Sequence, residues 1–339
     1  MSITILGIES SCDDTSAAII QDGYLLSNLI ADQDVHRNYG GVVPELASRA
    51  HQQNIIPVVK QAIKSAGISR YEIDAVAFTR GPGLLGSLLV GTSFAKGLGI
   101  SLNIPIIEVN HLQAHVLAQF IREKEKPSGI PSFPFLSLLV SGGHTQLMVI
   151  RDYLDMETIG RTIDDAAGEA FDKCGKIIGL PYPAGPEIDK LSVQGDRESF
   201  QFNKPRIKDL DFSFSGLKTS FLYFVRDKVK EDKDFVQKRK PDLCASLQKT
   251  IIDILLNKLI KASEKTGISR IGVAGGVSAN SALRNTLTNE AQKRDWDIYF
   301  PEYIFATDNA AMIAITGYFK FKKGLFSSLD IAPLARMDI

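Results

Sequence analysis

The sequence predicts an α/β protein made of two similar halves. Residues 3–20 and 135–150 share one pattern, in which an apolar strand, a loop of small polar residues and a second apolar strand follow one another. Each pattern is followed along the chain by a strand, a glycine-containing turn, a helix, a strand and a helix. Such alternation predicts parallel strands joined by right-handed crossovers. A length of 339 residues also favours two cores over one.

In the first half, the apolar runs Ile3–Ile8 and Ser16–Ile20 flank the polar loop Glu9–Thr15 and predict a hairpin. The other predicted elements of this half are a strand at 75–78, a turn at 80–86, a helix to about residue 97, a strand at 104–109 and a helix that opens near Asn110.

The second half repeats the plan. Its predicted elements are the hairpin strands 135–140 and 146–150, a strand at 270–274, a turn at 275–280, a helix to about residue 293, a strand at 297–300 and a helix that opens near Thr307 and Asp308. Between them, residues 161–265 carry apolar residues at three- and four-residue spacing, which predicts helices at 164–178, 215–230 and 243–263.

Two such halves describe the actin-like ATPase architecture, in which two RNase H-like lobes enclose a ligand cleft. We place the first lobe at residues 1–128 and the second at 129–339. The helical segment, at about 161–265, elaborates the second lobe, and the last helix has room to pack back on the first.

Composition and charge exclude several classes of protein. The three cysteines, Cys12, Cys174 and Cys244, are far apart, which fits a reduced cytoplasm and neither a disulfide framework nor a cysteine zinc site. We expect no membrane span and no secretion signal, because no apolar run is long enough and the N-terminus lacks a basic region. The formal net charge is zero, so any contact with nucleic acid must be local.

His111 and His115 form a candidate metal site. Residues four apart lie one turn apart on one helix face, so two imidazoles can chelate one cation. Asp308 begins the corresponding helix of the second half, and the two helix starts converge if the halves face each other. Two histidines and one aspartate leave coordination positions open, as in catalytic sites. A surface histidine pair and a helix N-cap at Asp308 are the alternatives.

Two glycine-containing turns are candidates for binding an anion through backbone N–H groups. Ser141–Thr145 follows an apolar strand, and Gly275–Asn280 leads from a strand into a helix. A plain hairpin turn and close helix–strand packing are the alternatives. The loop Glu9–Thr15 contains three carboxylates, which suit water, a metal or a hydroxyl better than bare phosphate; a solvated turn is the alternative.

Nine motifs, in order along nearly the whole chain, resemble one family. They are GIESSCDDTSAAI, GGVVPELASRAH, RGPGLLGSLLVG, NHLQAH, LVSGGHTQL, DDAAGEAFDK, FSFSGLKT, AGGVSAN and TDNAAMIA. Together they resemble the tRNA N6-adenosine threonylcarbamoyltransferase family, long described as O-sialoglycoprotein endopeptidases.

The resemblance implies an acyltransferase that moves a threonylcarbamoyl group from threonylcarbamoyl-adenylate to N6 of adenosine 37, in tRNAs that read codons beginning with A. The products are N6-threonylcarbamoyladenosine and AMP. It implies one divalent metal, iron or zinc, on His111, His115 and Asp308, and an adenine nucleotide (threonylcarbamoyl-adenylate, ATP or AMP). The implied nucleotide-binding residues are Leu139, Val140, Ser141, Gly142, Gly143, Asp172, Gly185, Asp189 and Asn280. Asp172 and Asp189 would accept hydrogen bonds from ribose hydroxyls, and Asp13 is a candidate proton acceptor.

The chain departs from the family pattern at two positions. Ala184 stands where glycine is common, which adds a methyl group where the backbone approaches the ligand. Asp14 stands where many members have glutamate. Neither change removes an implied ligand.

The resemblance also implies partners: tRNA, a paralogous inactive actin-like subunit and, as in the bacterial complex, a small P-loop ATPase. The paralogue is expected at Gly40–His51. The stretch Arg197–Lys240 holds twelve basic and seven acidic residues. Its candidate contacts with tRNA are Arg206, Lys208, Lys218 and Lys228; a solvated helical surface is the alternative.

Three other functions remain open to the sequence. An actin-like sugar or acetate kinase, or an ATPase of another pathway, would share the fold but has no need for two histidines and an aspartate at helix starts. A non-catalytic scaffold would need no metal ligands. An endopeptidase would need the HExxH glutamate or a nucleophile–base pair, and the His111–His115 segment has leucine, glutamine and alanine between its histidines. Fold alone does not decide among them.

Overall fold

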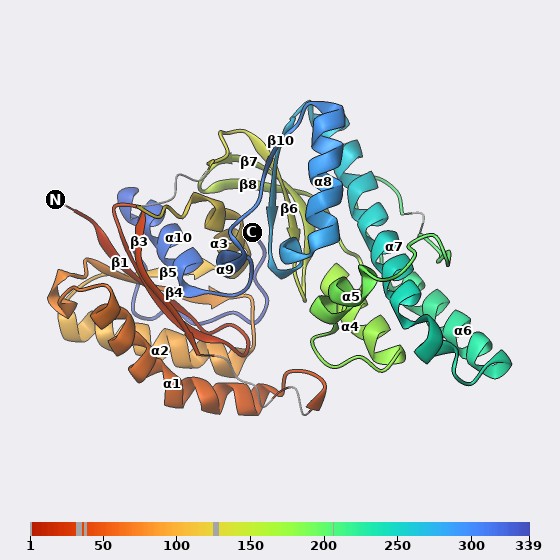
Figure 1. The fold of residues 1–339 in the computed structure, drawn as a ribbon. Helices are drawn as coiled ribbons and strands as arrows, with labels where there is room; N and C mark the ends of the chain where they lie inside the picture. The colour runs from red at the N-terminus through yellow and green to blue at the C-terminus, as the bar shows by residue number, and fades with distance from the viewer. Residues whose placement is uncertain (1, 32–35, 37–38, 125–128, 206) are drawn as a thin grey trace. The chain divides into compact units, whose positions relative to one another are not determined.

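The structure is a computed structural model that describes residues 2–31, 36, 39–124, 129–205 and 207–339 (Figure 1). The chain forms two compact units, each with a five-stranded sheet. The first unit comprises Met1–Pro131, Arg151–Met156 and Pro301–Ile339, and the second comprises Ser132–Ile150 and Glu157–Phe300.

The elements of the first unit are, in chain order, β1 (Thr4–Glu9), β2 (Thr15–Gln21), β3 (Tyr24–Ala31), α1 (Pro44–Ser65), the 3-10 helix η2 (Arg70–Glu72), β4 (Ala75–Gly81), α2 (Leu85–Leu102), β5 (Ile106–Asn110), α3 (His111–Leu117), η3 (Ala118–Phe120), α9 (Tyr303–Ala306) and α10 (Ala310–Lys322).

The elements that follow in the second half are, in chain order, β6 (Phe135–Val140), β7 (Thr145–Asp152), β8 (Asp155–Arg161), α4 (Ala167–Ile177), α5 (Ala184–Ser192), α6 (Ser215–Glu231), α7 (Phe235–Thr266), β9 (Arg270–Ala274), η4 (Gly276–Ala279), α8 (Ser281–Arg294) and β10 (Asp297–Tyr299).

The two sheets have the same topology. The first has the order β3-β2-β1-β4-β5, with β1 antiparallel to β2 and parallel to β4. The second has the order β10-β9-β6-β7-β8, with β6 antiparallel to β7 and parallel to β9. The predicted duplication of an α/β half is therefore confirmed. The strands β3 and β8, which extend each hairpin to three strands, were not predicted.

Helices cover both faces of the first sheet (Figure 1). On one face α1 packs against β2 and β3, and α2 packs against β4. On the other face α10 packs against β1, β2 and β4. Glycines permit this approach, since a Cβ on Gly7 would lie 2.4 Å from the backbone oxygen of Ala310, and one on Gly317 would lie 2.4 Å from Ala77 Cβ. Residues 301–339 therefore belong to the first compact unit, which differs from the predicted lobe bounds.

Helix α2 corrects one expectation from the sequence. Its 18 residues have a mean hydropathy of 1.3, so by length and composition alone it could cross a membrane. The same test is passed by core helices of proteins that span no membrane. Helix α2 packs against α1 and β4, and 33% of its residues are buried.

The predicted helical elaboration is confirmed in the second unit. Helices α4, α6 and α7 lie where apolar spacing predicts them, and α5 adds a short helix that was not predicted. Side chains from α4, α5, α6 and α7 form one hydrophobic core with the inner faces of β6, β7 and β9. This core fixes the N-terminal ends of α5 and α8.

The C-terminal segment 331–338 runs along the first unit and is held there largely through its backbone. The Leu334 N–H donates to the Arg80 carbonyl (2.8 Å). The Asp338 carbonyl accepts from the Asn110 side-chain amide (3.0 Å). The segment therefore reaches the residue that immediately precedes His111.

Candidate metal centre and nucleotide-binding residues

Helix α3 begins directly after β5 and carries both histidines. Asn110 is its N-cap, and the side-chain oxygen accepts from the backbone N–H groups of Leu112 (2.9 Å) and Gln113 (3.2 Å). The cap fixes where the helix starts, and the four-residue spacing places both rings on one face. The ring centroids of His111 and His115 are 4.7 Å apart.

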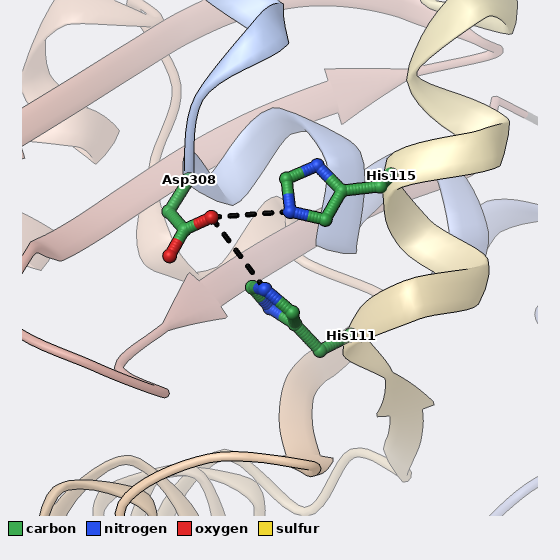
Figure 2. A group of neighbouring side chains, drawn as sticks. All are labelled: His111, His115 and Asp308. Atoms are coloured by element: carbon green, nitrogen blue, oxygen red, sulfur yellow. Dashed lines mark ion pairs between the residues drawn. The ribbon is translucent and has the colours of Figure 1, made fainter. Parts of the chain in front are cut away.

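Asp308 lies between α9 and α10 and points toward both rings (Figure 2). Its Oδ1 is 3.5 Å from His111 Nε2 and 3.1 Å from His115 Nε2. The N-cap of α10 is Asn309, whose side chain accepts from the Met312 N–H (3.1 Å). The alternative role of Asp308 as the helix cap is therefore wrong, and its carboxylate faces the histidines instead.

The three side chains could hold one metal ion. One donor atom from each of His111, His115 and Asp308 lies within 4.8 Å of the others. All three residues belong to the first compact unit. The Asp308 carboxylate reaches the histidines because the following helix, α10, packs on the first sheet. Asp308 follows the second half in the sequence, but it lies in the same compact unit as the two histidines.

His115 provides a direct test of whether the site suits a cation. Its side chain is 1% exposed, and neither ring nitrogen has a well-formed hydrogen bond within the described part of the chain. A buried polar atom without a partner is costly and calls for an explanation. A metal shared by Nε2 and the Asp308 carboxylate, 3.1 Å away, explains the poorly formed contact at Nε2, and imidazole and carboxylate are suitable ligands for iron or zinc. The residues therefore fit a divalent ion.

Glu9, at the end of β1, orients the first histidine. It is fully buried, and its Oε2 lies 3.1 Å from His111 Nδ1 and accepts from the Thr79 hydroxyl (2.7 Å). Its Oε1 accepts from the Ser11 backbone N–H (2.5 Å). A carboxylate on one ring nitrogen of a ligand histidine fixes the tautomer and turns the other nitrogen to the metal. The sequence singled out the loop that begins at Glu9, and did not assign this contact.

The charges of the cluster stabilise one another. Burial alone would lower the pKa of His111, but the nearby Asp308 and Glu9 outweigh it and raise the pKa to about 10. Burial would raise the pKa of Asp308, and the facing His111 reverses this and lowers it well below its usual value. A cation held by the same atoms would replace the proton of His111, because a histidine binds a metal in its neutral form.

The loop between β1 and β2 contains the candidate proton acceptor Asp13. The Cys12 carbonyl accepts from the Ser87 hydroxyl (3.0 Å) and lies 3.0 Å from His51 Nε2. The loop is thereby held against α1 and α2. Asp13 and Asp14 are half-buried on it, and the role of Asp13 in catalysis stays a prediction.

The implied nucleotide-binding residues all lie in the second unit. Leu139 and Val140 are buried at the end of β6, and Ser141, Gly142 and Gly143 form the turn to β7. A Cβ on either glycine would meet no described atom within 4 Å. The turn therefore has free space on the side where its two glycines lack a side chain.

Three polar side chains hold the N-terminal ends of two helices. Asp172 accepts from the Ala184 N–H at the start of α5 (2.7 Å). Asp189 accepts from the N–H (2.8 Å) and the hydroxyl (2.9 Å) of Ser281 at the start of α8. Asn280 is the N-cap of α8. Helix α5 contains Gly185 and Asp189 and is bonded at its start to Asp172 of α4. The hydrogen bonds from Asp189 to Ser281 place α5 beside Asn280, the residue that precedes Ser281.

The methyl group of Ala184 is accommodated between two helices. Its side chain is 1% exposed, and a Cβ on Gly175 of α4 would lie 2.3 Å from Ala184 Cβ. The methyl group packs between α4 and α5. The neighbouring Gly185 has open space where its side chain would be.

Part of the basic stretch is neutralised locally. Lys228 pairs with Glu231 (2.7 Å) and Lys230 with Asp227 (3.0 Å) along α6. Arg206 lies outside the described residues. A contact with tRNA at Lys208, Lys218 and Lys228 stays a prediction.

The fold and the cluster define a two-lobed actin-like α/β protein with a candidate metal centre. The chain belongs to the tRNA N6-adenosine threonylcarbamoyltransferase family, TsaD, whose model matches residues 24–315. This is a family of acyltransferases, so the resemblance stated from the motifs is confirmed. The kinase, scaffold and endopeptidase alternatives are not supported.

Relatives match along the whole chain. The chain is 60% identical to a tRNA N6-adenosine threonylcarbamoyltransferase of Porphyromonas gingivalis, over 99% of each chain. It is 61% identical to one from Phocaeicola vulgatus, over the full length of both. Among solved structures, full-length HypF in a phosphate- and nucleotide-bound form gives a TM-score of 0.63 at 14% identity, over 96% of this chain and 47% of HypF. At that identity the likeness shows a shared fold alone.

Proposed function

We propose that this chain transfers the threonylcarbamoyl group from threonylcarbamoyl-adenylate to N6 of adenosine 37 in tRNAs that read codons beginning with A. One observation carries the proposal. In a chain that belongs to this family, His111, His115 and Asp308 converge with donor atoms within 4.8 Å. A kinase of the same fold has no use for this ligand set.

In this proposal the cluster holds one divalent ion, iron or zinc. A divalent ion held by these residues would supply Lewis-acid polarisation of the carbamoyl or phosphate oxygen. Glu9 keeps the His111 ring in the orientation that turns Nε2 to the ion. Two imidazoles and one carboxylate leave further coordination positions for substrate.

The second unit binds the adenylate. Asp172, Asp189 and Asn280 contact the adenosine, and the turn Ser141–Gly143 offers backbone N–H groups to the phosphate. This assignment is supported by the open space at the glycines and by the shared position of the polar groups at the starts of α5 and α8.

The reaction is an acyl transfer. The exocyclic amine of adenosine 37 forms a bond to the carbamoyl carbon, the carbon–oxygen bond to phosphate breaks, and AMP leaves with the electron pair. The amine loses one proton, for which Asp13 is the candidate acceptor. An adenine amine is a poor nucleophile, so orientation and charge stabilisation supply most of the rate.

The enzyme acts in the cytoplasm on tRNA, with a paralogous inactive actin-like subunit and a small P-loop ATPase as partners. The tRNA presents adenosine 37 from a loop in which a base can be splayed out. Helices α1 and α2 support a protein partner near Gly40–His51, because they expose the apolar side chains Ile56, Leu85, Leu89 and Ile100.

The test is a reconstitution of the reaction. The purified chain is combined with its candidate partners, threonylcarbamoyl-adenylate and unmodified tRNA, and the modified nucleoside is measured by mass spectrometry. We expect modification by the wild type and none by His111→Ala. The control Gln113→Ala changes the same helix between the two histidines and away from their face.

Two outcomes would count against the proposal. Failure of the metal-loaded wild type and its partners to modify tRNA would reject the function. Full activity of a metal-free His111→Ala preparation would reject the role of the metal and leave the transfer reaction standing.

A further inference from the structure

Helix α7 carries a buried side-chain amide, that of Gln248, which contacts the implied nucleotide-binding residue Asn280. Gln248 is 3% exposed. Its Oε1 accepts from the Asn280 side-chain amide (2.6 Å), and its Nε2 donates to the Ser192 hydroxyl (2.7 Å). Both contacts use the side-chain amide of Gln248, so a variant that lacks this amide loses both hydrogen bonds.

The second contact continues to the other implied ligand of the adenosine. The Ser192 hydroxyl donates to the backbone carbonyl of Asp189 (2.7 Å) in the last turn of α5. Gln248 is therefore joined directly to Asn280 and, through Ser192, to the turn that bears Asp189. One side chain from a third helix ties α5 to the start of α8.

The geometry fixes which way the Asn280 amide faces. Its Oδ1 is committed to the Leu283 N–H (2.9 Å) as the cap of α8. Its Nδ2 donates one proton to Gln248, which leaves the second proton for a further acceptor. Without Gln248 the amide would lose a buried partner and its fixed orientation.

The network also lies beside an open space. Gln248, Ser192 and Ser281 line a pocket of about 360 Å³ between α5, α7 and α8. The contacts that hold Asn280 and Asp189 are therefore next to the surface and are not part of the deep core.

We propose that Gln248 is a positioning residue of the adenine-nucleotide site, which sets the direction of the Asn280 amide and the place of Asp189 relative to it. The inference rests on the proposed function, because it takes Asn280 and Asp189 as the groups that contact the adenosine. Gln248 acts through these residues and makes no contact with substrate.

The main test compares Gln248→Met, which keeps the length and removes both hydrogen bonds, with Thr250→Val. Thr250 is the matched control, since it is 4% exposed on the same helix and its hydroxyl donates within that helix, to the Ser246 carbonyl (2.8 Å). The dissociation constant of AMP is measured by calorimetry on the purified chain. We expect a rise of about tenfold for Gln248→Met, because the Asn280 amide would no longer be held toward the adenosine, and no change for Thr250→Val.

Steady-state kinetics in the reconstituted reaction separate positioning from general damage. For Gln248→Met we expect KM for threonylcarbamoyl-adenylate to rise in step with the AMP dissociation constant, with kcat nearly unchanged. A merely structural role would lower the melting temperature and the amount of active enzyme and would leave KM as it is.

Two further variants keep the proposal testable if Gln248→Met folds poorly. Gln248→Glu retains the acceptor for Asn280, and we expect it to recover part of the AMP affinity. Ser192→Ala cuts the link to Asp189 alone, and we expect it to reduce the preference for AMP over its 2′-deoxy analogue.

The outcomes are distinguishable. Wild-type affinity for AMP in both Gln248→Met and Ser192→Ala, with the wild type active on tRNA, would overturn the positioning role and leave the function intact. Failure of the wild type itself to bind AMP and to modify tRNA would reject the proposed function, and the inference with it.

Discussion

The candidate metal centre and the candidate nucleotide site differ in how their polar groups are satisfied. In the metal centre, His115 is buried with no well-formed hydrogen bond at either ring nitrogen among the described residues. In the nucleotide site, Asp172, Asp189 and Asn280 already hold helix ends. Here the open space lies instead on the side of the turn where Gly142 and Gly143 lack a side chain.

The difference teaches where to look for each kind of ligand. A metal needs several side-chain donors at one point, so its site is visible as unsatisfied donors that converge. A phosphate can be held by backbone N–H groups, so its site is visible as a turn that nothing else covers. The side chains around such a turn then serve mainly to fix its surroundings.

The largest effect is expected at the metal ligands. Asp308→Ala removes the only carboxylate of the ligand set among the described residues. Residues that merely orient a metal ligand typically contribute up to about 100-fold to metal affinity. Because Asp308 is a ligand itself, we expect its loss to lower the affinity by more than about 100-fold. Metal content after dialysis, measured by mass spectrometry, checks this. Asp74→Ala in the same unit should keep its metal; an Asp308→Ala protein with a full complement of metal would show that the cluster is not the site.

A smaller effect is expected at the carboxylate behind the histidine. Glu9→Gln keeps the size of the side chain and removes the charge that orients His111, so we expect the metal affinity to fall by about 10- to 100-fold. Competition with a chromophoric chelator measures it. Thr79→Val removes only the hydroxyl that donates to Glu9 and should have a lesser effect. Equal affinities of Glu9→Gln and wild type would show that the contact does not support the metal.

The smallest effect is expected at the open turn. Gly142→Ala adds a methyl group into empty space, so we expect an unchanged melting temperature and an AMP dissociation constant raised about tenfold, as for the loss of one hydrogen bond. Gly168→Ala is the contrasting variant, because its Cβ would lie 2.6 Å from the Ser141 carbonyl and should destabilise the fold by about 1–3 kcal/mol. An unchanged affinity in Gly142→Ala would place the phosphate elsewhere.

Periodicity and motif spacing predicted much of the fold. The apolar runs of β1, β2, β6 and β7, and the strand–turn–helix order after them, are local signals that tertiary structure preserves. The strands β3 and β8 were missed because they are only partly buried and lack a clear apolar alternation. The long α7 has a non-helical residue, Arg239, near its start, and so only its apolar part from Leu243 was predictable.

The candidate site was predictable where its chemistry is local. The spacing of His111 and His115 requires only a helix, and the structure provides it. The sequence allowed the last helix to pack on the first lobe but did not specify it, because the place of Asp308 there depends on glycines such as Gly7 that let α10 lie on β1. Glu9 and Gln248 were not assigned because their partners lie 102 and 32 residues away in the chain.

The C-terminal segment 331–338 has a consequence for how the sequence can vary. Its described contacts with Arg80 and Asn110 use its own backbone atoms, so they do not depend on which side chains it carries. Replacements at the exposed positions Ala332, Ala335 and Arg336 should therefore be tolerated, whereas Ile331 packs on the core of the first unit, and insertion or deletion of a single residue would shift the backbone groups out of register with their partners. Selection would then preserve the number of residues in this segment more strictly than the amino acids at its exposed positions. A comparison of residue types alone would underrate the importance of the segment.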